Sequence, residues 1–477
     1  MPDKNVILWF RQDLRLTDNP ALIAAVQSGR VLPIYVLDDF HAASWRMGAA
    51  SRWWLHHSLT QLNKALDNRL RVFQGDPLQV IPTLCVDYEV SSVFWNRCYE
   101  PWQLQRDSKL KALLQKNRIE VQSHNGSLLW EPWQISKQDG TPYKVFTPFF
   151  NNGCLTAAAP RLPLGEPQEL HLADQSGSEP AISDLGLLPA VDWYESIARE
   201  WQPGQQGAES RLQCFLQHGL QHYKNGRDFP ALQAVSRLSP HLHFGEISPN
   251  QVWYQAQQEF QNRGLEVNGE HFQRELGWRE FSHYLLYHFP SLPTDNFQAK
   301  FDRFPWQQNK VLFDKWCHGR TGYPIIDAGM RELWQTGFMH NRVRMIVASF
   351  LVKNLLIHWR HGADWFWDCL VDADLANNSA SWQWVAGSGA DAAPYFRIFN
   401  PVTQGRKFDP NGEYVRRFVP EIANLPNKHL HDPSSAPSSV LEQSDIQLDC
   451  NYPRAIVDLR HSRERALQAF TELKNAT

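Results

Sequence analysis

Hydrophobic and polar positions follow two different patterns along the chain. Up to about residue 124, short apolar runs, such as residues 6–10 and 31–37, alternate with segments in which apolar residues recur every three or four positions. Continuous short apolar runs predict buried strands, and the three-to-four spacing predicts amphipathic helices. Because this alternation specifies a parallel sheet with helices on both faces, we expect a Rossmann-like α/β domain over residues 1–132.

Local signals place the elements of this domain. Asp18 or Asn19 can cap a first helix, Pro20 suits its first position, and Gly29 follows its last turn. Further helices are expected over residues 51–66 and 101–117, and further strands near residues 70–76, 90–100 and 119–125.

The pattern changes after residue 132. Residues 133–199 are rich in proline, glycine and serine, as in "APRLPLGEPQEL", and predict a connector that runs over the surface. From residue 200 onward the apolar spacing is helical almost throughout. We therefore expect an all-α domain over residues 200–477.

Composition narrows the class of protein. With 477 residues, 43% of them hydrophobic and 20% charged, the chain is expected to be a soluble globular protein of two or three domains. No apolar run is long enough to span a bilayer, and the N-terminal segment lacks the pattern of a signal peptide. Seven scattered cysteines without a C-x-x-C pair argue against disulfide, zinc and iron–sulfur frameworks. A cytoplasmic location follows as the simplest expectation.

The charge and the tryptophan content bear on binding. A net charge of −3 gives no global sign of nucleic-acid binding, so a DNA-binding face would have to be a local basic patch. The chain holds 20 tryptophans, many in its second half, which is more than core packing usually needs.

Two segments resemble cofactor or metal motifs without meeting their requirements. Residues 387–391, "GSGAD", do not follow a strand and lack the third glycine of a dinucleotide-binding turn. The segment "HLHFGE" supplies His241, His243 and Glu246, but two histidines at i and i+2 do not share a helix face. We expect the start of a helix with polar caps there, and no metal site.

Polar groups gather around aromatic residues at three places in the second half. Glu275, Trp278 and Arg279 share one helix face, which is also what a surface ion pair beside a packed tryptophan would show. The stretch "GFMHNRVRMIVASF" at 337–350 places charge before an apolar helix, although burying unpaired charge is costly. Residues 372–401 combine aspartates, asparagines, tryptophans and an arginine. Together these are too many polar groups for a plain helical core.

The segments that carry these groups resemble, in the same order, the motifs of the DNA photolyase/cryptochrome family, nearest to its class I cyclobutane pyrimidine dimer (CPD) photolyases. They are "WFRQDLRLTDN" (9–19), "YKVFTPFF" (143–150), "SRLSPHLHFGEISP" (236–249), "ELGWREF" (275–281), "TGYPIIDAGMREL" (321–333), "MHNRVRM" (339–345) and "DLANNSASWQW…DAAPYFRIFNP" (374–401). The resemblance covers essentially the whole chain. It implies an α/β antenna domain, a helical FAD-binding domain, and light-driven repair of pyrimidine dimers flipped out of DNA.

The resemblance implies that FAD works as the reduced anion. Arg344 matches the arginine beside the anionic ring, and Asp372 matches its salt-bridge partner. Asp374 would accept from a ring N–H, and Asn378 matches the residue facing flavin N5, where an amide can donate or accept but cannot readily supply a proton. The other residues implied at the cofactor are Tyr223, Val235, Ser236, Arg237, Leu238, Ser239, Phe272, Glu275, Arg279 and Asn341, with Val235 standing where the family usually has threonine.

Three tryptophans, Trp382, Trp359 and Trp306, match the family's electron-transfer chain from the flavin to the surface. Any one of them could equally be a core residue. Because all three stand at matching motif positions, we expect them to reduce the flavin in light.

The resemblance also implies a lesion pocket. Trp278 and Trp384 offer flat walls on which a flipped base can stack, an interaction worth about 1–3 kcal/mol per base. Glu275 can hydrogen-bond the lesion when it carries a proton, and Asn341 touches both cofactor and lesion. Enzymes that repair (6-4) photoproducts carry histidines where this chain has Asn341 and Met345, so CPDs are the expected substrate. The contacts expected to DNA beyond the pocket are Arg227, Arg279, Arg342, Arg397, Gln404 and Lys407.

Several questions stay open at this level. Folate-binding members carry an Asn-Glu pair where this chain has Trp102 and Gln103, so folate, a deazaflavin, another flavin or no antenna chromophore are all compatible with the sequence. A cryptochrome-type blue-light photoreceptor and a (6-4) photolyase are the alternative functions. Asn378 and the lack of a long C-terminal extension disfavour the former, and Met345 disfavours the latter and DASH-type cryptochromes. The expected partner is dimer-containing DNA of the nucleoid, bound by a monomer with no membrane and no obligate protein partner.

Overall fold

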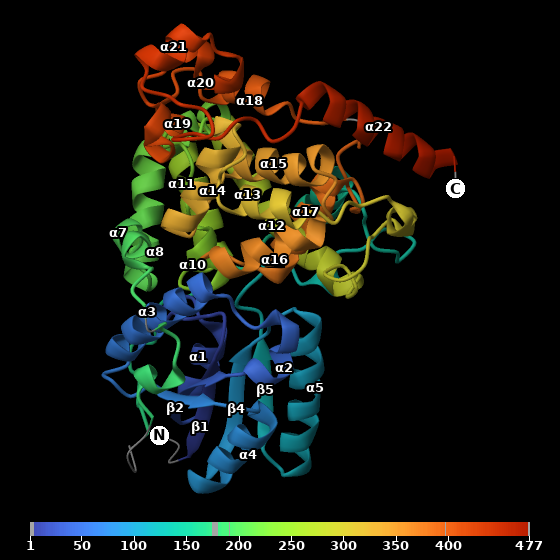
Figure 1. The fold of residues 1–477 in the computed structure, drawn as a ribbon. Helices are drawn as coiled ribbons and strands as arrows, with labels where there is room; N and C mark the ends of the chain where they lie inside the picture. Colours follow the sequence, from blue (N-terminus) through green and yellow to red (C-terminus); the bar gives the residue numbers. More distant parts are fainter. Residues whose placement is uncertain (1–3, 174–179, 190, 396, 476–477) are drawn as a thin grey trace. The chain divides into compact units, whose positions relative to one another are not determined.

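The computed structural model describes residues 4–173, 180–189, 191–395 and 397–475, and they form two compact units. The first unit comprises residues 1–221, 236–290 and 371–376, and the second comprises residues 222–235, 291–370 and 377–477. The units therefore do not follow the order of the chain, which Figure 1 shows in colours from blue to red.

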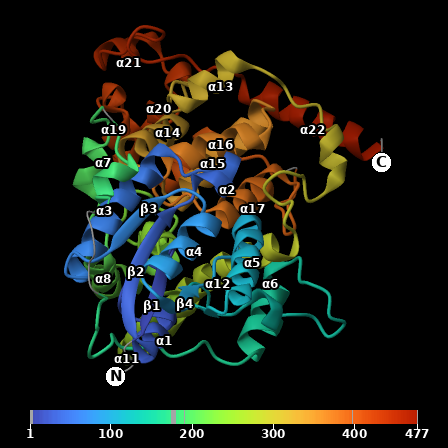
Figure 2. The same ribbon diagram turned by 90° about the horizontal axis from the view of Figure 1, so that it is seen from below.

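A five-stranded parallel sheet forms the centre of the N-terminal part of the first unit. Its strands are β1 (Asn5–Phe10), β2 (Arg30–Leu37), β3 (Arg71–Gln74), β4 (Val90–Asn96) and β5 (Glu120–His124), arranged in the order β3-β2-β1-β4-β5. The chain starts in the middle strand, proceeds to one edge and then returns to the other side, as seen for the blue strands of Figure 2. The expected α/β class with a parallel sheet is confirmed.

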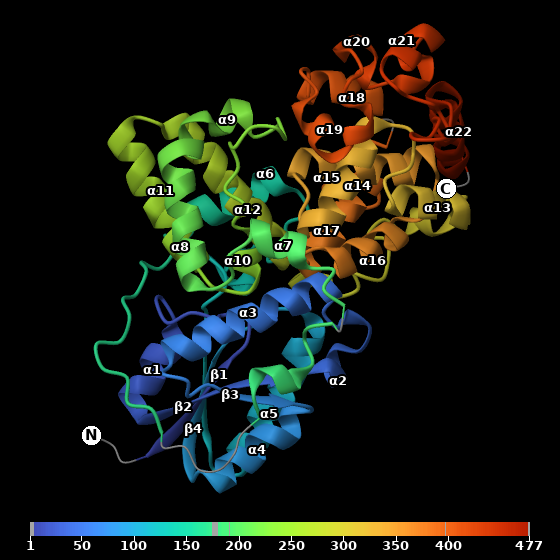
Figure 3. The same cartoon turned by 60° about the vertical axis from the view of Figure 1, so that its left-hand side comes forward.

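Helices cover both faces of this sheet. In Figure 3, α1 (Pro20–Ser28) and α3 (Ala49–Ala65) lie on one face, and α4 (Pro77–Asp87) and α5 (Pro101–Lys116) lie on the other; the short α2 (Asp39–Ala42) follows β2. This division is what right-handed crossovers produce when the strand order reverses direction after β3.

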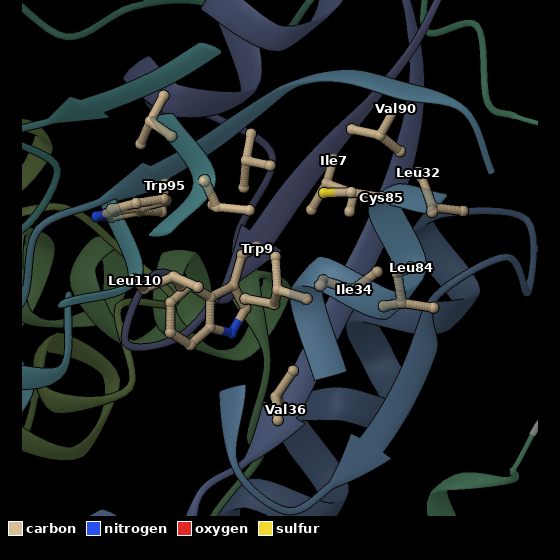
Figure 4. Close-up of a cluster of buried hydrophobic side chains, with 14 of the residues drawn as sticks. Ile7, Trp9, Leu32, Ile34, Val36, Leu84, Cys85, Val90, Trp95 and Leu110 are labelled. Atoms are coloured by element: carbon tan, nitrogen blue, oxygen red, sulfur yellow. The ribbon is translucent and has the colours of Figure 1, made fainter. Parts of the chain in front are cut away.

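The hydrophobic core on the α4 and α5 face follows from strand alternation. Ile7 and Trp9 of β1 and Ile34 of β2 point to that face and meet Leu84 of α4 and Leu110 of α5 (Figure 4). Successive strand residues alternate between faces, so the buried Val6, Leu8 and Phe10 of β1 point to the opposite face.

The sequence predicted the start of α1 but did not predict helix α4. The Asn19 side chain accepts a hydrogen bond from the Leu22 N–H, and Pro20 is the first residue of α1, so the predicted cap is confirmed. Helix α4 has no counterpart in the sequence analysis, because Pro82 lies inside it and proline normally argues against a helix interior.

The rest of the first unit consists of an irregular connector followed by helices. Residues 133–199 contain only short elements, among them α6 (Phe146–Pro148) and α7 (Glu195–Glu200). Three longer helices follow in the described residues of this unit, α8 (Gln205–Cys214), α11 (Pro249–Arg263) and α12 (Glu266–His288), with the short α10 (Ser239–His243) between α8 and α11.

All regular elements in the described residues of the second unit are helices, which confirms the expected all-α character of the C-terminal part. Its elements are α9 (Tyr223–Gly226), α13 (Lys310–Cys317), α14 (Pro324–Thr336), α15 (Asn341–Ser349), the π-helical turn η9 (Phe350–Asn354), α16 (Trp359–Cys369), α17 (Leu375–Ala386), α18 (Pro401–Phe408), α19 (Glu413–Phe418), α20 (Asn427–Leu430), α21 (Ser438–Gln443) and α22 (Leu459–Asn475), with the first two residues of α17 belonging to the first unit. Among the described residues, no helix has both the length and the apolar character needed to cross a membrane.

The "GSGAD" and "HLHFGE" segments have structural roles. Residues 387–391 follow helix α17, and the Gly387 N–H bonds the Gln383 carbonyl, so this segment ends a helix. In "HLHFGE", His241 and Glu246 are buried and bonded to each other, and Glu246 also accepts from Trp54 Nε1. His241 and His243 lie in the last turn of the short helix α10 and Glu246 follows it, so the expectation that these residues start a helix is wrong. No metal-binding cluster occurs among the described residues.

Candidate functional site

The helix face predicted on α12 exists, and its aromatic member is already stacked. The ring centroids of Trp278 and Phe146 are 3.8 Å apart with an interplanar angle of 12°. Phe146 belongs to the "YKVFTPFF" segment, so two family motifs far apart in sequence meet in the first unit. One face of the indole is thereby covered by Phe146.

Arg279 faces the interior of the first unit. Its guanidinium forms a 3.0 Å ion pair with Glu280, and its side chain is only 12% exposed. Glu280 is itself buried and accepts from the backbone N–H of Leu129. Arg279 is therefore held by a neighbouring carboxylate, and its expected contacts with the cofactor and with DNA both stay predictions.

Asp372 and Asp374, both expected at the cofactor, are buried and hydrogen-bonded within the first unit. The Ser239 hydroxyl donates to Asp372 Oδ2 over 2.6 Å. Asp374 Oδ2 lies 3.4 Å from His243 Nδ1 and 3.5 Å from His283 Nε2. Burial alone would raise the pKa of Asp374, but the two histidines outweigh it and hold that pKa well below its usual range. Asp374 is therefore a fixed anion that can accept from an N–H.

A polar cavity surrounds this carboxylate. Burial, together with the charge of Asp374, raises the pKa of Glu100 to about 6. The cavity is lined by residues of the α/β part and of the helices of the first unit: Gln12, Cys98, Tyr99, Glu100, Ser127, Leu242, His243, Arg279, His283, Asp374 and Ala376. The histidines that line it were not predicted as site residues.

The "SRLS" segment leads into α10 as expected. Arg237 has φ +53°, in the left-handed region, and Ser236 Oγ accepts from the Leu238 N–H at 3.4 Å. The Arg237 guanidinium lies 4.4 Å from the Trp201 ring centroid and 3.3 Å from Glu200. The segment is thus a tight turn anchored by Arg237, with α10 beginning at Ser239.

In the second unit, the charged half of "GFMHNRVRMIVASF" has partners. Arg342 Nη2 forms a 2.8 Å ion pair with Asp228, and its guanidinium lies 4.6 Å from the Phe408 ring centroid. Arg344 Nε donates to the Met339 carbonyl at 2.7 Å. Asn341 is exposed at the first position of α15, with Met345 half-buried one turn on. The two neutral residues thus stand beside fixed arginines.

His340, which the sequence analysis passed over, caps this helix. Its Nδ1 accepts from the Arg342 N–H at 3.2 Å, while its Nε2 is buried without a hydrogen-bond partner. Burial and the nearby arginines lower the pKa of His340 to about 4, so the ring is neutral near pH 7. The sequence offers little signal for this role, because histidine is an uncommon N-cap residue.

The three tryptophans of the expected electron-transfer chain all lie in the second unit. Trp382 and Trp359 are buried, Trp306 is half-buried, and Trp359 Nε1 donates to Asn296 at 2.8 Å. The ring centroid of His358 lies 5.0 Å from that of Trp306 and 5.5 Å from that of Trp359. The buried Trp359 and the half-buried Trp306 therefore both lie beside His358, and their role in electron transfer stays a prediction.

Asn378 has a defined orientation. Its Nδ2 donates to the Ala363 carbonyl of α16 at 3.0 Å, which directs Oδ1 away from that contact. The remaining expected residues of the second unit are distributed between interior and surface. Tyr223 is buried, with the Arg227 guanidinium 5.3 Å from its ring centroid; Val235, Trp384 and Gln404 are half-buried; Arg397 and Lys407 are exposed. Glu275 is half-buried and Phe272 buried on α12 of the first unit.

Two family profiles match this chain. The profile described as "DNA photolyase" matches residues 6–168, and the one described as "FAD binding domain of DNA photolyase" matches residues 272–472. A deoxyribodipyrimidine photo-lyase of Agrobacterium fabrum is 46% identical over 99% of this chain and 98% of its own length. The chain belongs to the DNA photolyase/cryptochrome family. Its C-terminal part is therefore an FAD-binding domain, and the resemblance inferred from the motifs is confirmed.

Other members of the family show its functional range. Cryptochrome-1 of Arabidopsis thaliana is 37% identical over 98% of this chain and 70% of its own length. A crystal structure of a bacterial class III photolyase from Agrobacterium tumefaciens superposes with a TM-score of 0.96 at 45% identity, covering 100% of this chain and 98% of that one. A Synechocystis cryptochrome has a TM-score of 0.89 at 30% identity, covering 98% of this chain and 100% of the other. Both repair enzymes and cryptochromes thus share this fold.

Proposed function

We propose that this protein repairs cyclobutane pyrimidine dimers in DNA in a light-driven reaction, by electron transfer from reduced FAD to the flipped-out dimer. The observation that carries the proposal is the start of α15, where Asn341 is exposed and Met345 follows one turn later. Neither side chain can act as a general acid, which the rearrangement of a (6-4) photoproduct requires. Splitting a cyclobutane needs no such acid.

The lesion is proposed to bind by stacking and hydrogen bonding. Trp278, fixed by Phe146 on one side, and Trp384 are the stacking surfaces. Glu275 and Asn341 hydrogen-bond the flipped base edges. The DNA backbone is proposed to be held by Arg227, Arg279, Arg342, Arg397 and Lys407, with Gln404. Arg342 would exchange its partner Asp228 for a phosphate.

The donor set of the chain fits a flavin. Bound FAD supplies the electron that light excites. Asp374 is held as an anion and can accept from a ring N–H, while Asn378 presents Oδ1 because its Nδ2 is occupied by Ala363. Arg344 supplies positive charge for an anionic ring, and its pairing with Asp372 stays a prediction. Tyr223, Phe272, Arg279 and the turn of Val235, Ser236, Arg237, Leu238 and Ser239 complete the proposed cofactor residues. Trp382, Trp359 and Trp306 would deliver electrons from the surface.

The subclass is proposed to be class III rather than the class I expected from the motifs. The class III photolyase of Agrobacterium tumefaciens covers the entire chain with a TM-score of 0.96, which supports this choice. We further propose that the protein acts as a monomer on nucleoid DNA in the cytoplasm.

A blue-light photoreceptor is the second candidate, because a plant cryptochrome is 37% identical to this chain. Asn378 separates the two functions: an acid or cysteine at this position, as cryptochromes often have, can supply a proton, whereas an amide cannot.

The proposal is tested with purified, chemically reduced protein and a duplex oligonucleotide that contains one thymine dimer. Blue light is expected to restore two thymines per dimer, measured by chromatography of the digested DNA, and no restoration is expected in the dark. If the protein binds the duplex but restores no thymines in light, the repair proposal is wrong and the photoreceptor function is favoured.

A further inference from the structure

Lys353 is a buried lysine in the second unit. Its side chain is 1% exposed, within the π-helical turn η9, and it forms no ion pair with a carboxylate in the part of the chain that the structure describes. Its Nζ donates a 2.9 Å hydrogen bond to the carbonyl oxygen of Arg397 and lies 5.3 Å from the Tyr395 ring centroid. Burying an ammonium group without a carboxylate is costly, so a buried lysine in this setting is a candidate for a functional role.

The segment bonded by Lys353 is held at a second point by the same stretch of helix. Ser349, four residues before Lys353, accepts a 3.3 Å hydrogen bond from the Phe399 N–H through its Oγ. Residues four apart lie on one side of a helix. The C=O of Arg397 and the N–H of Phe399 are therefore both tied to the surface of the α15–η9 stretch.

Tyr395 and Asn400, which flank Arg397 in the chain, also have defined contacts. Tyr395 is buried, with its ring centroid 4.5 Å from that of Phe470. Asn400 caps α18 by accepting from the Thr403 N–H. Arg397 lies between these two residues in the chain and is exposed. Lys353 thus bonds the backbone of a residue whose own side chain carries a positive charge.

We propose that Lys353 is a positioning residue for DNA binding: through the Arg397 carbonyl, and together with Ser349, it fixes the segment that presents the Arg397 guanidinium to a DNA phosphate. The inference rests on the proposed function, in which Arg397 is a DNA contact. An ammonium suits this task because it donates a charge-assisted hydrogen bond and adds positive potential beneath the phosphate.

The charge on Lys353 changes near neutral pH. Burial, with a smaller effect of Arg397, lowers the pKa of Lys353 to about 7. The ionisable groups that face it are Arg397 and the Tyr395 phenol, and Arg465 bonds the neighbouring Asn354 carbonyl. The contribution of Lys353 to DNA binding is therefore expected to be larger at pH 6 than at pH 8, because the protonated form is the one that attracts phosphate.

The test is a double-mutant cycle of Lys353→Met and Arg397→Ala. The measured quantity is the Kd for a duplex with one thymine dimer at fixed salt, determined by fluorescence anisotropy. Lys353→Met is expected to weaken binding about tenfold in the wild-type background and less than about twofold in Arg397→Ala, since the effect passes through Arg397. Lys353→Gln, which keeps an N–H donor, is expected to recover part of the loss, and Lys310→Met, at an exposed lysine of α13, is the control for charge.

Equal losses in both backgrounds, or wild-type affinity of Lys353→Met at pH 6, would overturn the inference. If thermal unfolding shows Lys353→Met to be unfolded at the assay temperature, Ser349→Ala takes its place in the same cycle with the same expectations. Failure of the proposed function looks different: the wild-type protein would then restore no thymines under light, whatever the outcome of the cycle.

Discussion

The Ser239 hydroxyl donates a 2.6 Å hydrogen bond to Asp372 Oδ2, although the two residues are 133 positions apart in the chain. The hydroxyl comes from the turn of the "SRLS" motif, and the carboxylate precedes α17. Two motifs expected at the cofactor are thereby joined directly within the first unit.

Ser239→Ala is expected to weaken FAD binding. The variant leaves a buried carboxylate without this donor, and an unmade hydrogen bond of this kind costs about 1–3 kcal/mol, so the Kd for FAD is expected to rise about tenfold. The measurement is the fluorescence of released FAD on dilution. Ser108→Ala, at an exposed serine of α5, is the matched control, and equal retention of FAD by both variants would contradict the assignment.

The neutral His340 predicts a pH dependence of stability. Its folded-state pKa of about 4 lies below the value near 6.5 of an unfolded histidine, so below pH 6.5 the unfolded state binds a proton that the folded state does not. The free energy of unfolding is therefore expected to fall as the pH falls from 6.5 to 4, with His340 contributing about 2 kcal/mol of loss between pH 7 and pH 5. His340→Asn keeps an N-cap acceptor without titrating. Urea unfolding of both proteins at the two pH values checks this, and an identical loss in the variant would contradict it.

Light-driven reduction of oxidised flavin tests the tryptophan chain. Trp306→Phe and Trp382→Phe each remove an easily oxidised ring and are expected to slow flavin photoreduction at least about tenfold. The rate is measured from the loss of the oxidised flavin absorption band under blue light. Trp133→Phe, at a 48% exposed tryptophan of the first unit, is the control. Unchanged rates in both chain variants would remove these residues from the account.

Gly362 provides a subtler perturbation of the same chain. A Cβ on this residue of α16 would lie 2.1 Å and 2.5 Å from two ring carbons of Trp382, so an alanine must displace the indole. Gly362→Ala is expected to slow photoreduction while every tryptophan is retained. Gly165→Ala, where a Cβ meets nothing within 4 Å, is the matched control. Wild-type photoreduction in a folded Gly362→Ala protein would show that the position of Trp382 is not critical.

Regular elements were predictable because their signals are local. The cap of α1 by Asn19 and Pro20, and the buried strands β1 and β2, follow from neighbouring residues alone. Helix α4 was missed because the local signal of Pro82 is opposed to the packing of Ile81 and Leu84 against the sheet, and the packing prevails.

The site was predictable only as far as motif resemblance reaches. The resemblance names Asp374 but not its partners, because His243 lies 131 positions away and only folding brings the two together. The sequence assigns roles to Arg279 but does not show that its guanidinium pairs with the adjacent Glu280, because neighbours in a helix do not normally face each other. Likewise, no sequence pattern shows that Lys353 points at a backbone carbonyl of residue 397.

The most direct test of the account compares two lesions in one experiment. Reduced protein is illuminated with two duplexes of the same sequence, one holding a cyclobutane thymine dimer and the other a (6-4) photoproduct, and the restored thymines are counted in each. Because Asn341 and Met345 provide no general acid, the account predicts restoration of the cyclobutane dimer and none of the (6-4) photoproduct. An unchanged cyclobutane dimer after illumination of the protein–DNA complex would contradict it.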